Sequence, residues 1–199
     1  MTIRNLIFDI PWIFIKSRSI LHGGFQTEKG LIRSHVGPKE HVLDFGCGTG
    51  QYAELFDEKR YVGIDIAGSY LRYARKQYPT KTFLGFDKNF SVPRESLFFD
   101  WVLCFAVVHH VPHEGVERFC GEILRVLRRA GQILILDHLP VSQQGNAWSK
   151  FLLSIDRGHF PRSPESVIDM FGNAVRTKEK TLIKTGPYSD YLLVLEKRH

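Results

Sequence analysis

Short apolar runs alternate with amphipathic stretches through most of the chain. Compact apolar runs predict strands at 41–45, 61–66, 82–86, 100–108 and 132–136. Apolar residues at helical spacing predict helices at 51–58, 69–78 and 114–129. The run at 100–108 is apolar throughout, which is typical of a strand buried on both faces of a parallel sheet. This alternation predicts an α/β fold with a doubly wound, mostly parallel sheet.

The last third of the chain departs from this pattern. Residues 141–159 are polar and aromatic, and Ser163 followed by Pro164 is typical of a helix start. Gly172 suits the position just after the end of that helix. An antiparallel hairpin at one edge of the sheet is predicted by two strand-like runs, 180–184 and 188–195. The expected sheet therefore has seven strands in a Rossmann-like arrangement.

The 199 residues contain no internal repeat and no low-complexity linker, which favours a single domain. Its core is expected at about 37–138 and 173–199. The remaining segments, about 1–36 and 139–172, are expected to form a helical substrate lid. Both are rich in aromatic and apolar residues, among them Phe14, Phe25, Trp148, Phe151 and Phe160.

Composition and charge narrow the possible classes of protein. The chain is 43% hydrophobic and 24% charged, which excludes a disordered or collagen-like chain. The net charge of +6 permits nucleic acid or acidic partners, but no long basic run is present, so a generally basic surface is the simpler interpretation. The three cysteines form no C-x-x-C pair, which fits a reducing, cytoplasmic location.

The N-terminal stretch 6–15 is the most apolar part of the expected lid. Asp9 and Pro11 interrupt it, and it is too short to cross a bilayer. Stable membrane insertion is therefore not expected, and an anchor lying in the membrane interface remains an alternative to a lid or a packed helix.

Titratable residues stand at the end of one predicted strand after another. In an open α/β sheet, ligands bind outside the carboxyl ends of the strands. A single site at this edge is therefore predicted from five strand ends, which carry Asp44, Asp65, Asp87, His109-His110 and Asp137-His138.

A glycine-rich run from Gly46 to Gly50 follows the first predicted strand. Glycine permits a sharp turn and leaves room for a ligand to approach the backbone. Asp65, at the end of the second strand, has the spacing of a carboxylate that accepts the hydroxyls of a ribose. The same run also satisfies the fingerprint G-x-G-x-x-G/A, ending at Ala53, so a nicotinamide-dependent oxidoreductase is one alternative function.

Four segments carry a resemblance to a known family. VLDFGCGTG at 42–50 resembles the first motif of the class I S-adenosylmethionine-dependent methyltransferases, and YVGIDI at 61–66 resembles their second. FDWV at 99–102, followed by VHHV at 108–111, resembles the fourth-strand motif of the ubiquinone/menaquinone-biosynthesis-like, small-molecule branch. EILRVL at 122–127 resembles the helix before the fifth strand. The resemblance covers about 41–137 and implies methyl transfer from S-adenosylmethionine to a small molecule.

The resemblance also implies a cofactor site. Gly46 and Gly48 are expected against the methionine part, with Asp44 supporting its ammonium group, and Asp65 is expected on the ribose. Asp87 and the backbone of Lys88 are expected on the adenine. The complete implied set is Asp44, Gly46, Cys47, Gly48, Asp65, Ile66, Asp87, Lys88 and Phe105. Two departures from the family pattern are Lys88-Asn89 after Asp87 and Arg129-Ala130 before Gly131.

Methyl transfer from a sulfonium is an in-line displacement, in which the protein supplies proximity and alignment. A base is needed only where the accepting O, N or C atom must lose a proton. His109, His110 and His138 are the candidate bases. Neighbouring residues of a strand point to opposite faces, so only one of His109 and His110 is expected to face the pocket. No metal site is predicted, because His110 and His113 lack a third ligand.

The aromatic lid residues favour an acceptor with an apolar or aromatic part, although packing in the core explains them equally well. Arg157 and Arg162 are candidates for binding an acidic group on it. A nucleic-acid methyltransferase is the second alternative function. Residues 104–107 lack the Asn/Asp-Pro-Pro-Tyr/Phe motif of enzymes that methylate base amino groups, so no nucleic-acid partner is predicted.

Overall fold

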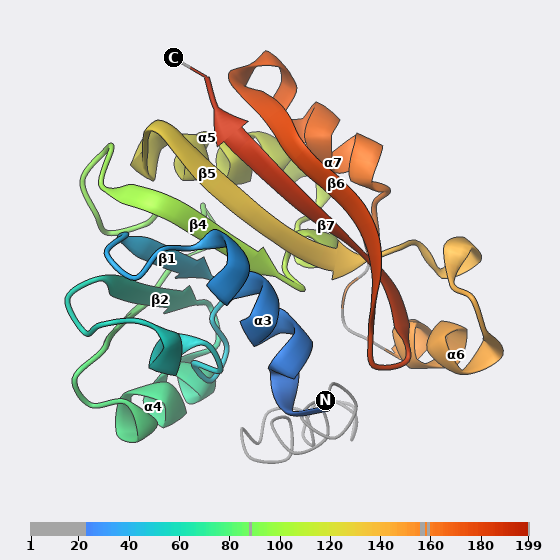
Figure 1. The fold of residues 1–199 in the computed structure, drawn as a ribbon, viewed down its shortest axis with the longest axis horizontal. Helices are drawn as coiled ribbons and strands as arrows, with labels where there is room; N and C mark the ends of the chain where they lie inside the picture. The colour runs from blue at the N-terminus through green and yellow to red at the C-terminus, as the bar shows by residue number, and fades with distance from the viewer. Residues whose placement is uncertain (1–22, 88, 156–157, 159, 199) are drawn as a thin grey trace.

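The structure is a computed structural model that describes residues 23–87, 89–155, 158 and 160–198. Within them, seven strands form one sheet in the order β3-β2-β1-β4-β5-β7-β6 (Figure 1). The strands are β1 Val42–Phe45, β2 Tyr61–Asp65, β3 Thr82–Gly85, β4 Phe99–Phe105, β5 Leu127–His138, β6 Val175–Thr185 and β7 Tyr188–Lys197. The first five pair in parallel, and β7 lies antiparallel between β5 and β6. The predicted α/β class and edge hairpin are confirmed.

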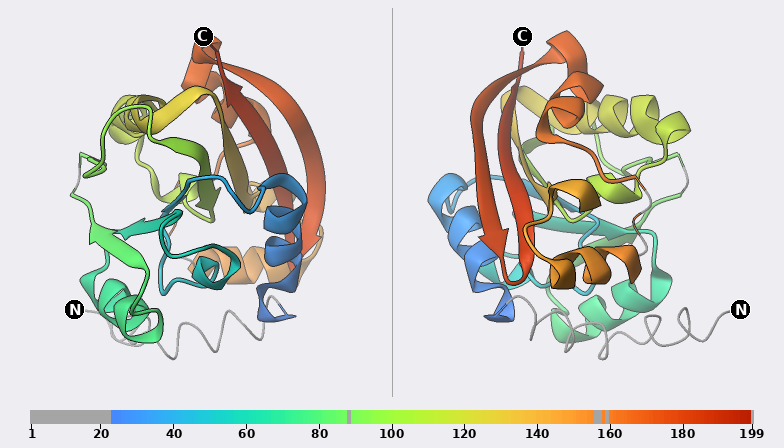
Figure 2. Two further views of the ribbon diagram at one scale, coloured as in Figure 1. Left: turned by 60° about the vertical axis from the view of Figure 1, so that its left-hand side comes forward. Right: turned by 90° about the vertical axis from the view of Figure 1, so that its right-hand side faces the viewer.

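Helices cover both faces of this sheet, as the views in Figures 1 and 2 show. One face carries α5 and α7, and the other carries α3 and α4. The helices are α3 Gln26–His35, α4 Gly68–Gln77, α5 Val116–Val126, α6 Ala147–Ile155 and α7 Pro164–Phe171. Of the described helices, none has the length and apolar character needed to cross a membrane.

The two-residue period of the strands divides the core between the two faces. In β5, Ile133 and Ile135 pack in the cluster that contains α5 and α7, whereas Leu134 and Leu136 pack in the cluster beneath α3 and α4. Because β4 and β5 are buried on both sides, their carboxyl ends are held rigidly side by side. The residues that directly follow β4 and β5 are therefore held in fixed positions.

Two helices, α3 and α7, lie in segments that were expected to form the lid, and both pack against the sheet. Ile32 of α3 is 1% exposed and packs beside Val42 of β1. Val167 of α7 is fully buried in the opposite cluster, and Ser163 caps this helix by accepting a hydrogen bond from the amide of Ser166. Each of these helices buries its apolar face against the sheet. Phe14 and the stretch 6–15 lie outside the described residues.

The predicted helix at 51–58 is wrong. The structure has only a 3-10 turn, Ala53–Leu55, in this place. Tyr52 and Phe56 are nevertheless buried, so the apolar pattern that suggested a helix is satisfied by a shorter element. Gly48 and Gly50 both have positive φ, so the chain enters this segment from an irregular loop.

The predicted helix at 114–129 and the strand at 132–136 meet at a different residue. The helix α5 ends at Val126, and β5 already begins at Leu127, which pairs with Phe99 of β4. The register between the two strands shifts just after this pair. Ala130 has a φ of 56°, a backbone conformation that is uncommon for a residue other than glycine. Pairing with β4 therefore wins over local helix propensity.

A buried polar pair ties β1 to β2 beneath the glycine-rich loop. Asp44 is 1% exposed, and its Oδ2 accepts a hydrogen bond of 2.7 Å from the hydroxyl of Tyr61. Burial raises the pKa of Asp44 to about 7, although the bond from Tyr61 acts in the opposite direction, and nearby Asp65 raises it further. The carboxyl therefore holds a proton in the folded protein at pH values where it is ionised in the unfolded chain.

Phe119 of α5 tests how much the core depends on one ring. It is fully buried, with ring centroids 5.2 Å from Phe45 and 5.6 Å from Phe90. We expect Phe119→Ala to lower the free energy of unfolding by about 3–5 kcal/mol in urea titrations. The control Phe151→Ala removes a ring that is 53% exposed and should change it by less than about 1 kcal/mol. Equal losses in both variants would contradict this account of the core.

Asp44→Asn should change how stability depends on pH. A raised pKa means that the folded state binds the proton more tightly, so this group lowers stability as pH rises from about 4 to about 7. From pH 4 to pH 8 the wild type should lose up to about 4 kcal/mol relative to Asp44→Asn, because the amide does not titrate. Urea unfolding at the two pH values measures the difference. Parallel curves for the two proteins would show that Asp44 is ionised in the folded state.

Candidate functional site

The loop after β1 turns back on the sheet and meets the loop after β4. The amides of Gly46 and Cys47 both donate to the carbonyl of Ile64, at 2.8 and 2.9 Å. Gly46 has a φ of 74°, and a Cβ atom there would lie 2.5 Å from Cγ2 of Val107. Only glycine allows this approach. The glycine loop and the segment that contains Val107 are therefore in direct contact.

Asp65 holds the glycine loop from the neighbouring strand end. Its Oδ2 accepts a hydrogen bond from the Gly48 amide at 2.8 Å, and its Oδ1 accepts one from the Ala67 amide at 2.7 Å. Burial raises its pKa above the ordinary value, against the lowering effect of these backbone bonds. Since each carboxylate oxygen can accept two hydrogen bonds, each keeps capacity for a further donor. The structure brings Asp65 and Gly48 together as the sequence predicts.

The other residues predicted to bind the cofactor differ in how far their side chains are exposed. Ile66 is 62% exposed beside Asp65, and Asp87 is exposed and accepts hydrogen bonds from the amide and side chain of Asn89. Cys47 and Phe105 are buried under the loop, at 2% and 7% exposure. Lys88 lies outside the described residues. Burial also raises the pKa of the Cys47 thiol well above its usual range, so this thiol is protonated.

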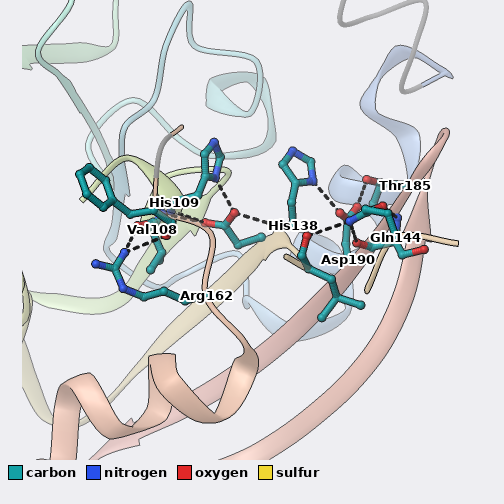
Figure 3. Close-up of polar contacts among 11 residues, drawn as sticks. Val108, His109, His138, Gln144, Arg162, Thr185 and Asp190 are labelled. Carbon is teal, nitrogen blue, oxygen red and sulfur yellow. Dashed lines mark hydrogen bonds and ion pairs between the residues drawn. The ribbon is translucent and has the colours of Figure 1, made fainter. Parts of the chain in front are cut away.

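Asp137, at the end of β5, is the centre of a second polar cluster, whose members His109 and His138 are labelled in Figure 3. Its Oδ2 accepts the amides of Val108 and His109 at 2.7 and 3.2 Å. Its Oδ1 lies 2.7 Å from the amide of His138 and 2.5 Å from Nδ1 of His109. Burial would raise the pKa of Asp137, but the His109 ring and these donors outweigh it and lower the pKa to about 2. A buried carboxylate thus ties the end of β5 to the loop after β4.

His138 has a carboxylate partner of its own. Its Nδ1 lies 2.6 Å from Oδ1 of Asp190, and Oδ2 of Asp190 accepts the hydroxyl of Thr185. The ring is 4% exposed, and its centroid lies 5.4 Å from that of His109 and 4.5 Å from that of Tyr188. Figure 3 shows the two imidazoles side by side, each turned toward its own aspartate.

Sequence reasoning missed the roles of Asp190 and Thr185. The sequence does hold one indication of the role of Asp190, which is a charged residue in the mostly apolar run 188–195. Most of β7 is buried, Asp190 included, so this carboxylate needs a polar partner. The partner follows only from the pairing of the strands, which places Asp190 opposite His138. Asp137 was recognised at its strand end, but its hydrogen-bond partners depend on a turn that the sequence pattern did not predict.

That turn is the 3-10 segment Val108–His110, where a continuing strand was expected. His109 is buried and His110 is exposed, with their ring centroids 4.1 Å apart. The expectation that only one of the two faces inward is met, although a turn and not a strand separates them. His113 lies against Phe160, with ring centroids 5.4 Å apart.

Arg162 is held within the protein by backbone carbonyls, and its expected contact with an acidic group of the acceptor stays a prediction. It is 8% exposed, and its guanidinium donates to the carbonyls of Val108, Phe160 and Val111 at 2.9, 3.1 and 2.8 Å. Its role is to hold the loop after β4, where the carbonyl groups have no strand partner. Arg157 lies outside the described residues.

Two hollows lie at opposite ends of the sheet. A small cavity of about 30 Å³ adjoins the histidines and is lined by His109, His138, Val141, Leu153, Gly158 and Pro161. A wider cleft of about 580 Å³ lies at the amino ends of β2 and β3, far from the glycine loop. Among the described residues, no group of three His, Cys, Asp or Glu side chains is placed to hold a metal ion.

Comparison with known proteins bears directly on this site. Residues 43–135 match the family model described as a methyltransferase domain. The chain is 27% identical over 143 residues to a malonyl-[acyl-carrier protein] O-methyltransferase of Pectobacterium atrosepticum, covering 70% of this chain and 54% of that protein. It is 31% identical over 94 residues to the tRNA (carboxymethyluridine(34)-5-O)-methyltransferase of Saccharomyces cerevisiae, covering 47% and 33%. The chain spans about half or less of the length of the curated relatives it matches.

A solved structure extends the likeness to the whole chain. It is the complex between the Trm112 methyltransferase activator of Haloferax volcanii and a putative methyltransferase, with a TM-score of 0.75 and 16% identity, covering 100% of this chain and 98% of that chain. At this identity the likeness shows the fold alone. The family match spans the glycine loop, Asp65 and the strands that carry them. Residues 43–135 are therefore similar to a methyltransferase domain, in a chain with the α/β fold of a solved methyltransferase structure.

Proposed function

We propose that the protein transfers a methyl group from S-adenosylmethionine to a small-molecule acceptor by in-line displacement. The observation that carries the proposal is the glycine loop held by Asp65 at the carboxyl ends of the parallel strands. The cofactor fits this place chemically, because the loop excludes a Cβ at Gly46 and Asp65 keeps acceptor capacity on both oxygens. When bound, the cofactor supplies the activated methyl group.

The residues around the loop would each hold one part of this cofactor. The backbone of Gly46 and Gly48 would face its methionine part, and Asp65 would accept the ribose hydroxyls. Ile66 offers an exposed apolar surface for the flat adenine, beside Asp87. Cys47 and Phe105 are buried, so they would support the loop from below. Asp44 would support the cofactor site indirectly, because its Oδ2 accepts a hydrogen bond from the hydroxyl of Tyr61.

The proposed acceptor is a small molecule with an apolar or aromatic part. Trp148 and Phe151 of α6 are 56% and 53% exposed, and their rings stack 5.7 Å apart on the segment that follows β5. Large exposed rings are uncommon on a free surface and suit a ligand-binding face. The curated relatives do not agree on an acceptor, since one is named for an acyl-carrier protein and another for tRNA.

Nucleic acid is disfavoured as the acceptor because three of the four basic side chains of β6 have a carboxylate partner. Arg176 and Lys178 both pair with Glu196, at 2.6 and 3.5 Å. Lys180 pairs with Glu165 at 2.9 Å. A surface that binds phosphates needs cations without such partners. A cytoplasmic location is part of the proposal, since the three cysteines are buried, free thiols that suit a reducing compartment.

Asp65→Ala tests the cofactor site. Loss of the charged hydrogen bonds to ribose should cost roughly 1.5–3 kcal/mol, so the Kd for S-adenosylhomocysteine in titration calorimetry should rise about 10- to 150-fold. The control Asp169→Ala removes an exposed carboxylate on α7 and should leave the Kd unchanged. NAD should not bind to either protein appreciably. Unchanged affinity in Asp65→Ala would place the cofactor elsewhere.

The choice between acceptors is tested with methyl-tritiated S-adenosylmethionine. Total tRNA and genomic DNA should take up no label above that seen with heat-denatured protein. Filter binding of the same nucleic acids at physiological salt should be weak and should fall steeply as salt is raised, as expected of non-specific contacts. Label incorporated at a defined nucleotide would overturn the small-molecule assignment and favour a nucleic-acid methyltransferase.

A further inference from the structure

The tautomer of His138 follows from its partners. An ionised carboxylate only accepts hydrogen bonds, so the short contact between Asp190 Oδ1 and His138 Nδ1 requires a proton on Nδ1. The second oxygen of Asp190 is occupied by the Thr185 hydroxyl, which fixes the orientation of the carboxylate. A neutral imidazole with its proton on Nδ1 presents a lone pair at Nε2.

Nε2 of His138 is buried and has no hydrogen-bond partner among the residues that the structure describes. Its ring borders the cavity of about 30 Å³. Buried polar atoms without a partner are rare in proteins and point to a missing water, ion or ligand group. A cavity of this size holds about one oxygen or nitrogen atom with its hydrogens. The fitting occupant is a donor, because the free position on the ring is an acceptor.

Val141, Leu153, Gly158 and Pro161 line the cavity together with the two histidines. An O–H or N–H group of a ligand would donate a hydrogen bond to the Nε2 lone pair. A carboxylate would not, because its oxygens and Nε2 are all hydrogen-bond acceptors.

The cavity and the cofactor loop lie at the same edge of the sheet. His138 ends β5, and His109 stands beside it in the turn after β4. Two residues before His109, Val107 packs on Gly46 of the glycine loop. His138, Thr185 and Asp190 all lie beyond residues 43–135, where the family match ends. The arrangement therefore draws on residues outside the matched region.

We propose that His138 is the proton acceptor of the methyl transfer, positioned by Asp190, and that the methyl acceptor carries an O–H or N–H group and not a carboxylate. The proposal rests on the proposed function. The acceptor's O–H or N–H bond breaks, and its proton passes to Nε2. The freed electron pair forms the new bond to the methyl carbon, while the carbon–sulfur bond breaks and its electron pair stays on sulfur. His109, held by Asp137, is a positioning residue.

The test uses protein labelled with 15N-histidine, studied by long-range 1H–15N NMR at pH 8 in the presence of S-adenosylhomocysteine. His138→Asn assigns the resonances of His138. We expect the wild type to carry its proton on Nδ1. Asp190→Asn should lose this preference, with thermal unfolding checking that the variant is folded. His35→Asn, which alters a distant histidine paired with Glu179, should leave the His138 resonances unchanged.

Phenol and benzoate are the ligand probes, because they share a ring and differ in the group they offer. Phenol should shift the Nε2 resonance of His138, benzoate should not, and His138→Asn should weaken phenol binding about tenfold. A proton on Nε2, or a response to benzoate alone, would overturn the proposal in favour of carboxylate binding. If neither phenol nor benzoate shifts the Nε2 resonance, the assignment of the cavity beside His138 to the methyl acceptor is overturned. Failure to bind S-adenosylhomocysteine would instead refute the proposed function, whatever the tautomer.

Discussion

The carboxylate of Asp137 is the constraint on which the acceptor side of the site depends. Four donors converge on it, from Val108, His109 and His138, although it is almost wholly buried. A buried charge is tolerated only when its hydrogen-bonding capacity is filled. The turn after β4 and the end of β5 are therefore locked to each other, which fixes the ring of His109 and the backbone of His138.

Much of the fold was predictable because strand and helix periodicities are local. The parallel strands, α4, the Ser163 cap of α7 and the edge hairpin all follow from nearby residues. The errors arose where a distant partner decided the outcome. Leu127 lies in the run predicted as helix but pairs with Phe99 of β4, and the segment after Gly50 buries Tyr52 without forming a helix.

The candidate site divides in the same way. The glycine loop and Asp65 were predictable, since a strand, a turn and a carboxylate at fixed spacing identify them. Asp190 was not, because its meeting with His138 depends on the register of an antiparallel pair 52 residues apart in sequence. The contacts of Arg162 were not predictable either, because composition does not reveal that three backbone carbonyls accept hydrogen bonds from its guanidinium.

The hairpin formed by β6 and β7 has a consequence for how such proteins diversify. It completes the sheet after the family-matched region has ended, and it brings Thr185 and Asp190 to the histidine side of the site. Its contacts with the glycine loop are indirect, through β5 and the turn after β4. A change in the hairpin can thus retune what the site accepts without disturbing how it holds its donor, so the two halves of the molecule are free to evolve at different rates.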